Sequence, residues 1–408
     1  MSLVALMLLM LARPARPGFA DTPAPWLRAH ALPLTTAEPT ADTSDLEPFL
    51  QLLAGKQVIA LGDATHGTHE LYALKQRLIP LLIQRANVRT AVLEAPYVDV
   101  PAPFDNYWFW DTSEVRELLA QIDVEVVGVD PFLAAATIGR VVSVVRAEDA
   151  ALAEEVARRY ECLRVYEDNP LSYGGTAGQP SCRTLILSVR PMLAQRFPEK
   201  DELLHAARIV EQGEEAWATN LANRDAAMAE NIEWLAARRP DANLVVWGHN
   251  EHFGRTPYIL NGPQPVTSTG TILARDLGDR YFVLGSVVDH GTFNAAELFG
   301  GGGIIRPFPM PAPAADDYAT LLRAAHLPLM IVPLPNPLPY WLAGSHRMRI
   351  AGSNVSSPDR PMVELTQDLG AKYDAVVYIE TSTPTRLTNT STAARRDSRR
   401  PTATPHSE

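Results

Sequence analysis

The stretch VIALGDATHGTHELYALKQRL, residues Val58 to Leu78, decides the fold predicted for this chain. The apolar run that ends at Gly62 predicts a strand buried on both faces of a sheet. The leucines that follow recur at spacings of three and four residues, namely Leu71, Leu74, Leu78 and Leu82. This spacing predicts a helix that packs one apolar stripe against the sheet, with a kink at Pro80.

Ionisable residues occupy the connection between this strand and this helix. Asp63, His66, His69 and Glu70 all follow the carboxyl end of the strand. Open α/β sheets bind ligands outside the carboxyl ends of their strands, so the position favours a functional site. The simpler alternative is that Asp63 and Thr65 cap the helix and that His66 is an ordinary turn residue.

Three other strand-like runs also end in polar residues. RTAVLEA (Arg89 to Ala95) ends with Glu94, VEVVGVD (Val124 to Asp130) ends with Asp130, and NLVVWGHNEH (Asn243 to His252) ends with His249, Asn250 and His252. Helical segments separate these runs, which predicts parallel strands whose carboxyl ends meet at one edge. The predicted cleft is lined by Asp63, His66, Glu94, Asp130, His249 and His252. Titratable groups gathered in one pocket favour a functional site over capping.

Composition and patterning predict one domain with a helical insertion. The chain has 408 residues, of which 46% are hydrophobic and 20% charged, as in ordinary globular proteins. Strand-like runs extend from Val58 to Thr381 and predict a largely parallel sheet flanked by helices. The helical pattern at about 132–240 predicts an insertion that forms a lobe over the cleft at the carboxyl ends. The net charge of -11 opposes nucleic acid as a partner, and no later segment is apolar enough to span a membrane.

The two ends of the chain differ from its centre. An apolar run from Leu3 to Ala12 predicts a signal peptide at residues 1–20 and export to the periplasm or the medium. The alternative is a cytoplasmic protein with an internal start codon. Residues 21–57 are expected to lead into the main domain at 58–382. Residues 383–408 contain almost no large apolar side chain, which predicts a disordered tail. Within the main domain, the glycine run Gly300 to Gly303 predicts a flexible loop near the mouth of the cleft.

The two cysteines leave two possibilities open. Cys162 and Cys182 flank a segment rich in Gly, Pro and Ser. They could form a disulfide in an oxidising compartment, or they could be two unrelated thiols. Their spacing does not match a zinc site, and neither has the neighbours that a cysteine nucleophile needs.

The residue types themselves favour direct activation of water. The sequence has no G-x-S-x-G motif and no reactive-cysteine context, so it offers no obvious nucleophile for a covalent intermediate. His66 is suited to act as a general base, with Asp63 or Glu94 fixing its tautomer. The groups expected to face the carbonyl oxygen are His249, His252 and Arg224, with Lys75 as a further cationic candidate.

The motifs also resemble those of a known family. GDATHGTHE is similar to the GE-x-THG-x-x-E signature of the erythromycin esterase family, with Asp63 where that family usually has Glu. The resemblance continues, in the same order and with similar spacing, through VLEA, WFWDTSEVRELL, GVD, NRDAAMAENIEWL and WGHNEH. The shorter side chain of Asp63 and a short stretch between Leu119 and Val124 are departures. The first departure is expected to affect the fine geometry of the predicted site, and the second is expected to affect which substrate it accepts.

The resemblance implies metal-independent hydrolysis of a carboxylic ester or macrolide lactone, a small-molecule substrate, without a cofactor. The catalytic residues assigned are His66, Asp63, Glu94, His249, His252 and Arg224, and the substrate-binding residues are Lys75, Glu70, Asp130 and Asn250.

Two other functions remain open at this point. His66, His249 and His252, with one of Asp63, Glu94 or Asp130, could also bind Zn, Mn or Fe with an activated water. A binding protein without activity, or an accessory factor in polysaccharide assembly, is the third possibility.

Overall fold

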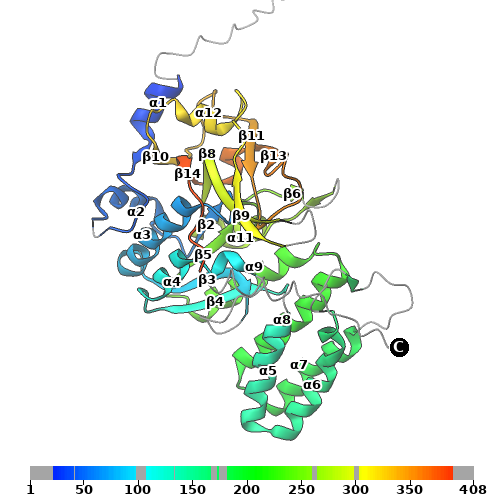
Figure 1. Cartoon of the computed structure of the whole chain (residues 1–408). Coiled ribbons are helices and arrows are strands. Elements are labelled where there is room, and N and C mark those ends of the chain that lie inside the picture. The colour runs from blue at the N-terminus through cyan, green and yellow to red at the C-terminus, as the bar shows by residue number, and fades with distance from the viewer. Residues whose placement is uncertain are drawn as a thin grey trace, which may run out of the picture.

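A ten-stranded sheet forms the centre of the molecule (Figure 1). The computed structural model describes residues 22–40, 42–97, 107–132, 134–166, 172–173, 182–259, 264–297 and 303–388. Six neighbouring strands are parallel, in the order β14 (Ala375–Ser382), β8 (Tyr281–Glu297), β2 (Val58–Asp63), β5 (Asn243–His249), β3 (Val88–Pro96) and β4 (Glu125–Asp130). The predicted α/β class with a largely parallel sheet is therefore confirmed.

Antiparallel strands extend the sheet beyond β14. The strand β10 (Leu329–Pro333) pairs with β14, and β1 (Leu32–Pro33) pairs with β10. The far half of β8 pairs with β9 (Ile305–Pro309) and β12 (Asn354–Val355). Two small sheets lie apart, formed by β11 (Ser345–Ile350) with β13 (Val363–Asp368) and by β6 (Tyr258–Ile259) with β7 (Pro265–Val266).

The central strands are apolar on both faces because helices cover both. In β2, Val58 and Ala60 enter the core on one face, and Ile59 and Leu61 enter the core on the other. The first face packs against α1 (Pro23–His30), α9 (Arg224–Arg238), α11 (Thr269–Leu277) and α12 (Tyr318–Arg323). The second packs against α2 (Glu47–Leu50), α3 (His69–Arg85) and α4 (Ser113–Leu119). Two short helices, α10 (Asn250–Phe253) and α13 (Leu369–Lys372), complete this part.

The helix α3 begins later than a cap at Asp63 or Thr65 would require. Its N-cap residue is Thr68, and Asp63 is the last residue of β2. The capping alternative is therefore wrong, and Asp63 and His66 remain available for other interactions. The helix continues through Pro80 to Arg85.

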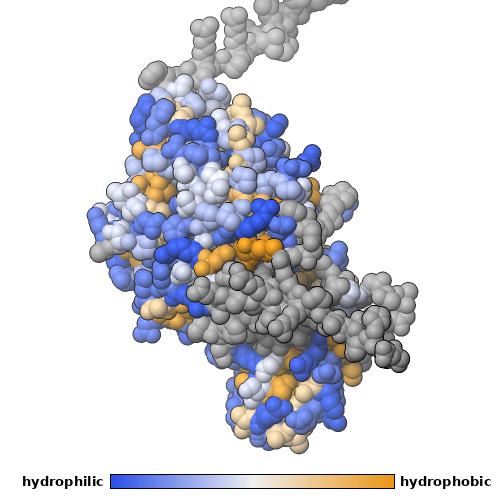
Figure 2. Space-filling model, in the orientation of Figure 1, coloured by the Kyte–Doolittle hydropathy of each residue, from blue (hydrophilic) through white to orange (hydrophobic). Residues whose placement is uncertain are grey.

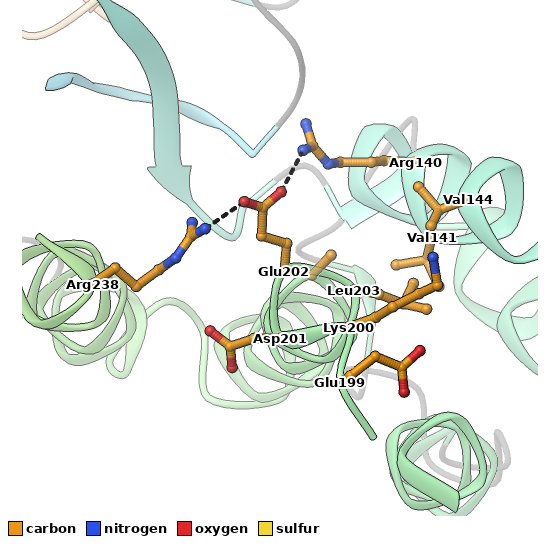
Figure 3. Close-up of a pocket in the computed structure, with 10 residues that line it drawn as sticks. Arg140, Val141, Val144, Glu199, Lys200, Asp201, Glu202, Leu203 and Arg238 are labelled. Carbon is orange, nitrogen blue, oxygen red and sulfur yellow. Dashed lines mark hydrogen bonds and ion pairs between the residues drawn. The ribbon is translucent and has the colours of Figure 1, made fainter. Parts of the chain in front are cut away.

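The predicted insertion forms a helical lobe beside the β4 edge (Figure 1). The lobe consists of α5 (Ala134–Glu148), α6 (Ala150–Arg164), α7 (Arg183–Arg196) and α8 (Asp201–Ala218), after which α9 returns to β4. A cavity of about 360 Å³ lies between the lobe and the end of α9, where Glu202 pairs with Arg140 and Arg238 (Figure 3). The residues that line it belong to the lobe and α9 and include none of the predicted catalytic residues.

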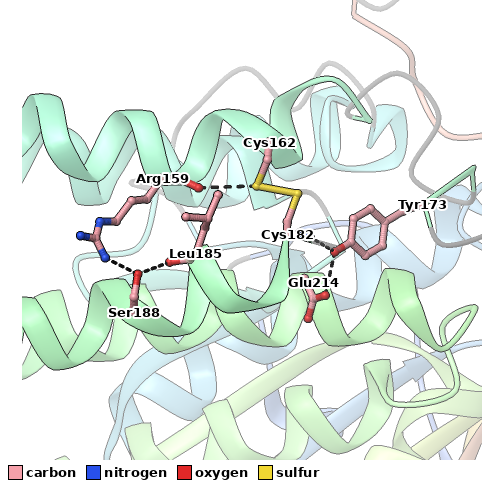
Figure 4. Close-up of a disulfide and its surroundings, with 7 residues drawn as sticks. All are labelled: Arg159, Cys162, Tyr173, Cys182, Leu185, Ser188 and Glu214. Atoms are coloured by element: carbon pink, nitrogen blue, oxygen red, sulfur yellow. Dashed lines mark hydrogen bonds between the residues drawn. A yellow bond between two sulfur atoms is a disulfide. The ribbon is translucent and has the colours of Figure 1, made fainter. Parts of the chain in front are cut away.

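A disulfide joins two helices of the lobe. Cys162 in α6 is bonded to Cys182, the N-cap residue of α7, and their Cα atoms are 5.8 Å apart (Figure 4). The hydroxyl of Tyr173 accepts a hydrogen bond from the Cys182 backbone N–H and donates one to Glu214. Of the two alternatives for the cysteines, the structure has the disulfide. Closing a loop of this size stabilises a fold by about 3 kcal/mol in the chain-entropy model.

The C-terminal segment is ordered further than the sequence indicated. Residues 383–388 bond to the core, whereas the tail was expected to be disordered from 383 onward. The predicted signal peptide at 1–20, residues 300–302 of the glycine loop and residues 389–408 lie outside the described part of the chain. None of the described helices is long and apolar enough to cross a membrane.

Candidate active site

Four parallel strands bring their polar carboxyl ends to one edge of the sheet. Asp63 at the end of β2 is in register with His249 at the end of β5. On the other side of β5, β3 carries Glu94 and pairs with β4, which ends at Asp130. The strand order β2, β5, β3, β4 therefore places these side chains next to one another, although their positions in the chain are far apart.

Glu94 lies at the centre of the polar cluster. Its Oε1 accepts a hydrogen bond from Arg224 Nη2 at 2.9 Å, and its Oε2 accepts one from the His249 backbone N–H at 2.8 Å. His252 Nε2 lies 3.2 Å from Oε1. Burial alone would raise the pKa of this carboxyl, but His252 and Arg224 hold it well below its ordinary value. Glu94 is therefore a fixed negative charge that links β3 with β5 and α9.

Arg224 forms a fork with Asp130. Its Nε lies 3.0 Å from Oδ1 and its Nη2 lies 2.6 Å from Oδ2, which is the bidentate geometry that binds a carboxylate most strongly. Tyr107 also donates to Oδ2 at 2.7 Å. Burial alone would lower the pKa of Arg224, but the carboxylates of Asp130 and Glu94 outweigh this effect and raise the pKa well above its ordinary value. The guanidinium is therefore held in one orientation by carboxylates from β3 and β4.

His252 is a second cation in the cluster. Its Nδ1 lies 3.0 Å from Asp225 Oδ1, and Asp225 also accepts bonds from Tyr258 and from the Thr269 backbone. Burial lowers the pKa of His252, but Asp225 and Glu94 outweigh it and raise the pKa to about 10. Both ring nitrogens therefore donate to carboxylates at neutral pH. Arg224 Nη1 lies 3.1 Å from His252 Nε2, and Glu94 accepts hydrogen bonds from both side chains, while Asp130 and Asp225 each bind one of them.

His66 and His249 differ from His252 because they are neutral. Burial lowers the pKa of His66 to about 3 and also lowers that of His249. The two ring centroids are 5.1 Å apart, and His66 stacks on Phe109 at 4.2 Å. The Nδ1 of His249 accepts a bond from the Glu251 backbone N–H, which leaves its proton on Nε2.

Two ring nitrogens in this pair are unused by the protein. His66 Nδ1 and His249 Nε2 are buried, and neither has a hydrogen-bond partner among the described residues. Buried polar atoms almost always have a partner, so such a pair indicates a place for water or a ligand. The arrangement combines a neutral imidazole that can accept a proton, an N–H donor and two fixed cations. It suits a reaction in which a proton is removed while negative charge develops nearby.

A sequence model of the family described as erythromycin esterase matches residues 93–382 of this chain. The chain belongs to the erythromycin esterase family. The predicted resemblance is confirmed, and it places the protein in a family of hydrolases. Among curated proteins, "Putative hydrolase YbfO" of Bacillus subtilis (strain 168) is 23% identical over 88% of this chain and 91% of its own length.

Three solved structures share the fold. A Bacillus cereus protein has a TM-score of 0.78 at 22% identity and covers 91% of this chain and 100% of its own. A succinoglycan biosynthesis protein has a TM-score of 0.75 at 17% identity, with 89% and 97% covered. A mutant of the erythromycin esterase EreC in its open conformation has a TM-score of 0.65 at 16% identity, with 86% and 97% covered.

Asp63 lies behind the cluster rather than beside His66. Its Oδ1 pairs with Lys75, and its Oδ2 accepts a hydrogen bond from Trp247 Nε1 at 2.6 Å. The ammonium of Lys75 also lies over the Trp247 ring. Both carboxylate oxygens thus bind groups other than the histidine whose tautomer Asp63 was expected to fix. Asp63 and Lys75, predicted as a catalytic and a substrate-binding residue of this family, form a buried ion pair with each other.

Two other predicted substrate-binding residues also have partners in the protein. Asn250 bonds through Nδ2 and Oδ1 to the backbone of Ser286 in β8, at 2.9 and 3.1 Å. Glu70 accepts hydrogen bonds from the backbone and the hydroxyl of Thr383. Their polar atoms are therefore engaged in holding α10 and the C-terminal segment in place.

His69 forms an ion pair on the flank of α3, and it makes stability depend on pH. Its Nδ1 lies 2.6 Å from Glu114 and its Nε2 lies 2.8 Å from Glu38. The bond to Glu114 raises the pKa of His69 to about 9. The resulting stabilisation is complete below pH 6.5, near the pKa of this histidine in the unfolded chain. It is lost as the pH rises through about 9, the pKa of His69 in the folded protein.

We expect His69→Gln to remove this dependence. Urea unfolding should show that the variant loses more free energy of unfolding, relative to wild type, at pH 6 than at pH 9.5. The reason is that the imidazole of wild-type His69 is fully charged only at pH 6. His205→Gln is the matched control, since burial lowers the pKa of His205 to about 4 and keeps it neutral over this range. An equal loss at both pH values in His69→Gln would contradict the ion pair.

The polar cluster includes residues that the sequence alone did not single out as catalytic. Asp225 fixes His252, Tyr107 and Tyr258 donate to carboxylates, and Phe109 stacks on His66. Asp225 directly follows Arg224 in the matched motif, which was the available signal. The aromatic run at Tyr107–Trp110 was a second signal, but an aromatic run usually indicates core.

The metal-site alternative does not fit the geometry of the donors. In the described part of the chain, no three His, Cys, Asp or Glu side chains are arranged to hold a metal ion. His252 is held by Asp225 and Glu94, and Glu94 and Asp130 are held by Arg224. A metal ion would have to displace these partners, so among the candidate ligands of the described polar cluster His66 and His249 alone have a ring nitrogen without a partner.

Proposed function

We propose that this protein hydrolyses a carboxylic ester or lactone with water activated by His66 and without a covalent intermediate. The observation that carries the proposal is the pair of neutral histidine rings, 5.1 Å apart, beside the cations Arg224 and His252: His66 Nδ1 and His249 Nε2 are buried and have no partner among the described residues. The motif resemblance and the family membership support the same class of reaction.

The reaction follows from the charges of these groups. His66 accepts a proton as the water oxygen bonds to the carbonyl carbon, and the carbonyl electron pair moves to oxygen. That oxyanion is stabilised by the Nε2–H of His249 and by the positive charges of Arg224 and His252; a single donor of this kind typically contributes a factor of about 100 or more. Glu94 stabilises the imidazolium, because its charge raises the pKa of His66 against the effect of burial. The carbon–oxygen bond then breaks as His66 returns its proton to the leaving oxygen.

The test compares wild type, His66→Gln and His205→Gln. Each is incubated with macrolides, simple esters and lactones, and acylated polysaccharides, with and without chelator, and the gain of one water is followed by mass spectrometry. Acylated polysaccharides are included because a protein of this fold is named for succinoglycan biosynthesis. His66→Gln should reduce kcat by about 100-fold or more, the usual contribution of a general base. His205→Gln should retain activity, since His205 packs on Trp234 in the lobe region.

Each outcome decides a specific point. Unchanged activity in His66→Gln would overturn the assignment of His66 as base. Loss of activity on chelation would favour metal-dependent hydrolysis. Absence of any hydrolysis by wild type would favour the binding or accessory role.

We also propose that the protein is exported. The apolar run Leu3 to Ala12 and the Cys162–Cys182 disulfide both support this, because disulfides persist in oxidising compartments. Fractionation of cells that express the full chain should recover protein outside the cytoplasm with a mass that lacks residues 1–20. Leu8→Arg, which interrupts the run, should retain the protein in the cytoplasm. Equal distribution of both variants would contradict export by this segment.

A further inference from the structure

The residues Thr383–Thr388, which follow β14, form a strap against the loop that carries His66. The backbone N–H of Thr385 donates to Gly67 O at 3.0 Å, and Thr383 O accepts from the His69 N–H at 2.8 Å. Thr68 and Pro384 form a β-bridge between these two bonds. The strap thus holds the backbone on the C-terminal side of His66 directly.

The same strap also holds the segment that follows Phe109. The backbone O of Arg386 accepts from the Ser113 N–H at 2.8 Å, and Thr112 and Leu387 form a second β-bridge. The hydroxyl of Thr388 donates to Asp111 Oδ2 at 2.9 Å. Side-chain bonds add to this, since the Arg386 backbone and guanidinium bind Glu114 and the guanidinium also binds Glu117.

The loop that carries His66 and Gly67 packs between the strap and β8. A side chain at position 67 is excluded, because a Cβ there would lie 1.8 Å from the backbone O of Asn294. Gly67 O accepts bonds from both Asn294 N and Thr385 N, and Asn294 Nδ2 donates to Thr385 O at 2.7 Å. The loop is therefore fixed from two sides by residues more than 200 positions away in the chain.

The ring of His66 is oriented by packing, since its Nδ1 has no hydrogen-bond partner among the described residues. The ring stacks on Phe109 at 4.2 Å and also lies 5.1 Å from the ring of His249. His66 and Phe109 belong to two segments that are distant in sequence, and the strap bonds to both.

We propose that Thr385 and Arg386 of the C-terminal strap are positioning residues that hold His66 against Phe109. This rests on the proposed function only for the role of His66 as the base. Without the strap, the two segments could separate and the His66 ring could rotate away from the reacting water. A displacement of about 1 Å at a catalytic group can reduce the rate by about 100-fold.

The test uses chains that end at Thr388 and at Ser382, together with Arg386→Ala in the full chain. Each is examined by circular dichroism, by kcat and KM on the best substrate, and by the rate at which diethyl pyrocarbonate modifies His66, read by mass spectrometry. The chain ending at Thr388 should match the full chain. The chain ending at Ser382 should show kcat lowered by about 100-fold with little change in KM, and faster modification of His66. Arg386→Ala should lie between them, and Arg85→Ala, which removes a comparably exposed arginine at the far end of α3, should match the full chain.

The modification rate keeps this test separate from the proposed function. If the full chain hydrolyses nothing, faster modification of His66 in the shortened chain still supports the strap. Equal modification rates in the chains ending at Ser382 and Thr388 overturn it. If the shortest chain is unfolded, the comparison of Arg386→Ala with Arg85→Ala decides: faster modification in the former supports the strap, and equal rates overturn it.

Discussion

Replacement of Arg224 by methionine is expected to lower hydrolysis by about 100-fold or more and to destabilise the fold by about 3–5 kcal/mol. The activity falls because the oxyanion loses a fixed cation. The stability falls because Asp130 and Glu94, both almost fully buried, lose the guanidinium that compensates their charges. Removing one partner of a buried ion pair leaves the other without solvent or counterion, which is among the most destabilising single changes.

The measurements are urea unfolding and steady-state kinetics at pH 7. Arg208→Met is the matched control, because Arg208 forms a similar fork with Glu230 at 2.8 and 3.0 Å but lies on α8, outside the polar cluster. Arg208→Met should destabilise the fold less than Arg224→Met, because the exposed fraction of the side chain is 25% for Arg208 and 16% for Arg224. The same substitution should leave kcat unchanged. Full activity in Arg224→Met would remove this residue from the proposed mechanism.

Replacement of Lys75 by methionine should have the second largest effect, on stability. Lys75 and Asp63 are both buried, and burial lowers the pKa of the lysine and raises that of the acid. We expect a loss of about 3–5 kcal/mol in the free energy of unfolding, since the carboxylate is left without its cation. The loss should be larger at pH 8 than at pH 5, because the remaining carboxyl can bind a proton at the lower pH.

A double-mutant cycle identifies the cause of that loss. Asp63→Asn with Lys75→Met removes both charges and keeps an oxygen for the Trp247 Nε1–H, so most of the stability should return. Lys56→Met, at a half-buried lysine whose Nζ donates to the backbone O of Asp279, should cost less, about 1 kcal/mol, because it leaves no buried carboxylate without its cation. If the losses of the two single variants simply add in the double variant, Asp63 and Lys75 are not energetically coupled.

The elements of the polar cluster could be predicted because they follow local rules. The apolar run Val58–Leu61 gave a strand buried on both faces, and the polar residues that end β2, β3, β4 and β5 were expected at one edge. This succeeded because parallel strands separated by helices must align their carboxyl ends. The assignment of Glu94, His249, His252 and Arg224 to one region needed nothing more than this rule and the matching motifs.

The partners of each side chain could not be predicted in the same way. The sequence offered Asp63 and Glu94 equally as partners for His66, yet Asp63 binds Lys75 and Trp247, and Glu94 binds Arg224 and the His249 backbone. The choice depends on the face of β2 from which the Asp63 side chain projects, and on the position of Lys75, nearly two helical turns after the start of α3. Neither is visible in residue spacing, because side-chain direction is set by packing against distant elements.

The sequence by itself determined the class of the fold, the strand ends that carry the ionisable groups and the family. Only the tertiary structure decided that His66 is neutral while His252 is charged, because burial and the neighbouring carboxylates set those states. It also decided that Thr383–Thr388, a polar segment with little apolar surface, is ordered. Composition predicts disorder from the apolar area that a segment can bury, whereas this strap is held by backbone hydrogen bonds to two segments that meet only in the folded chain.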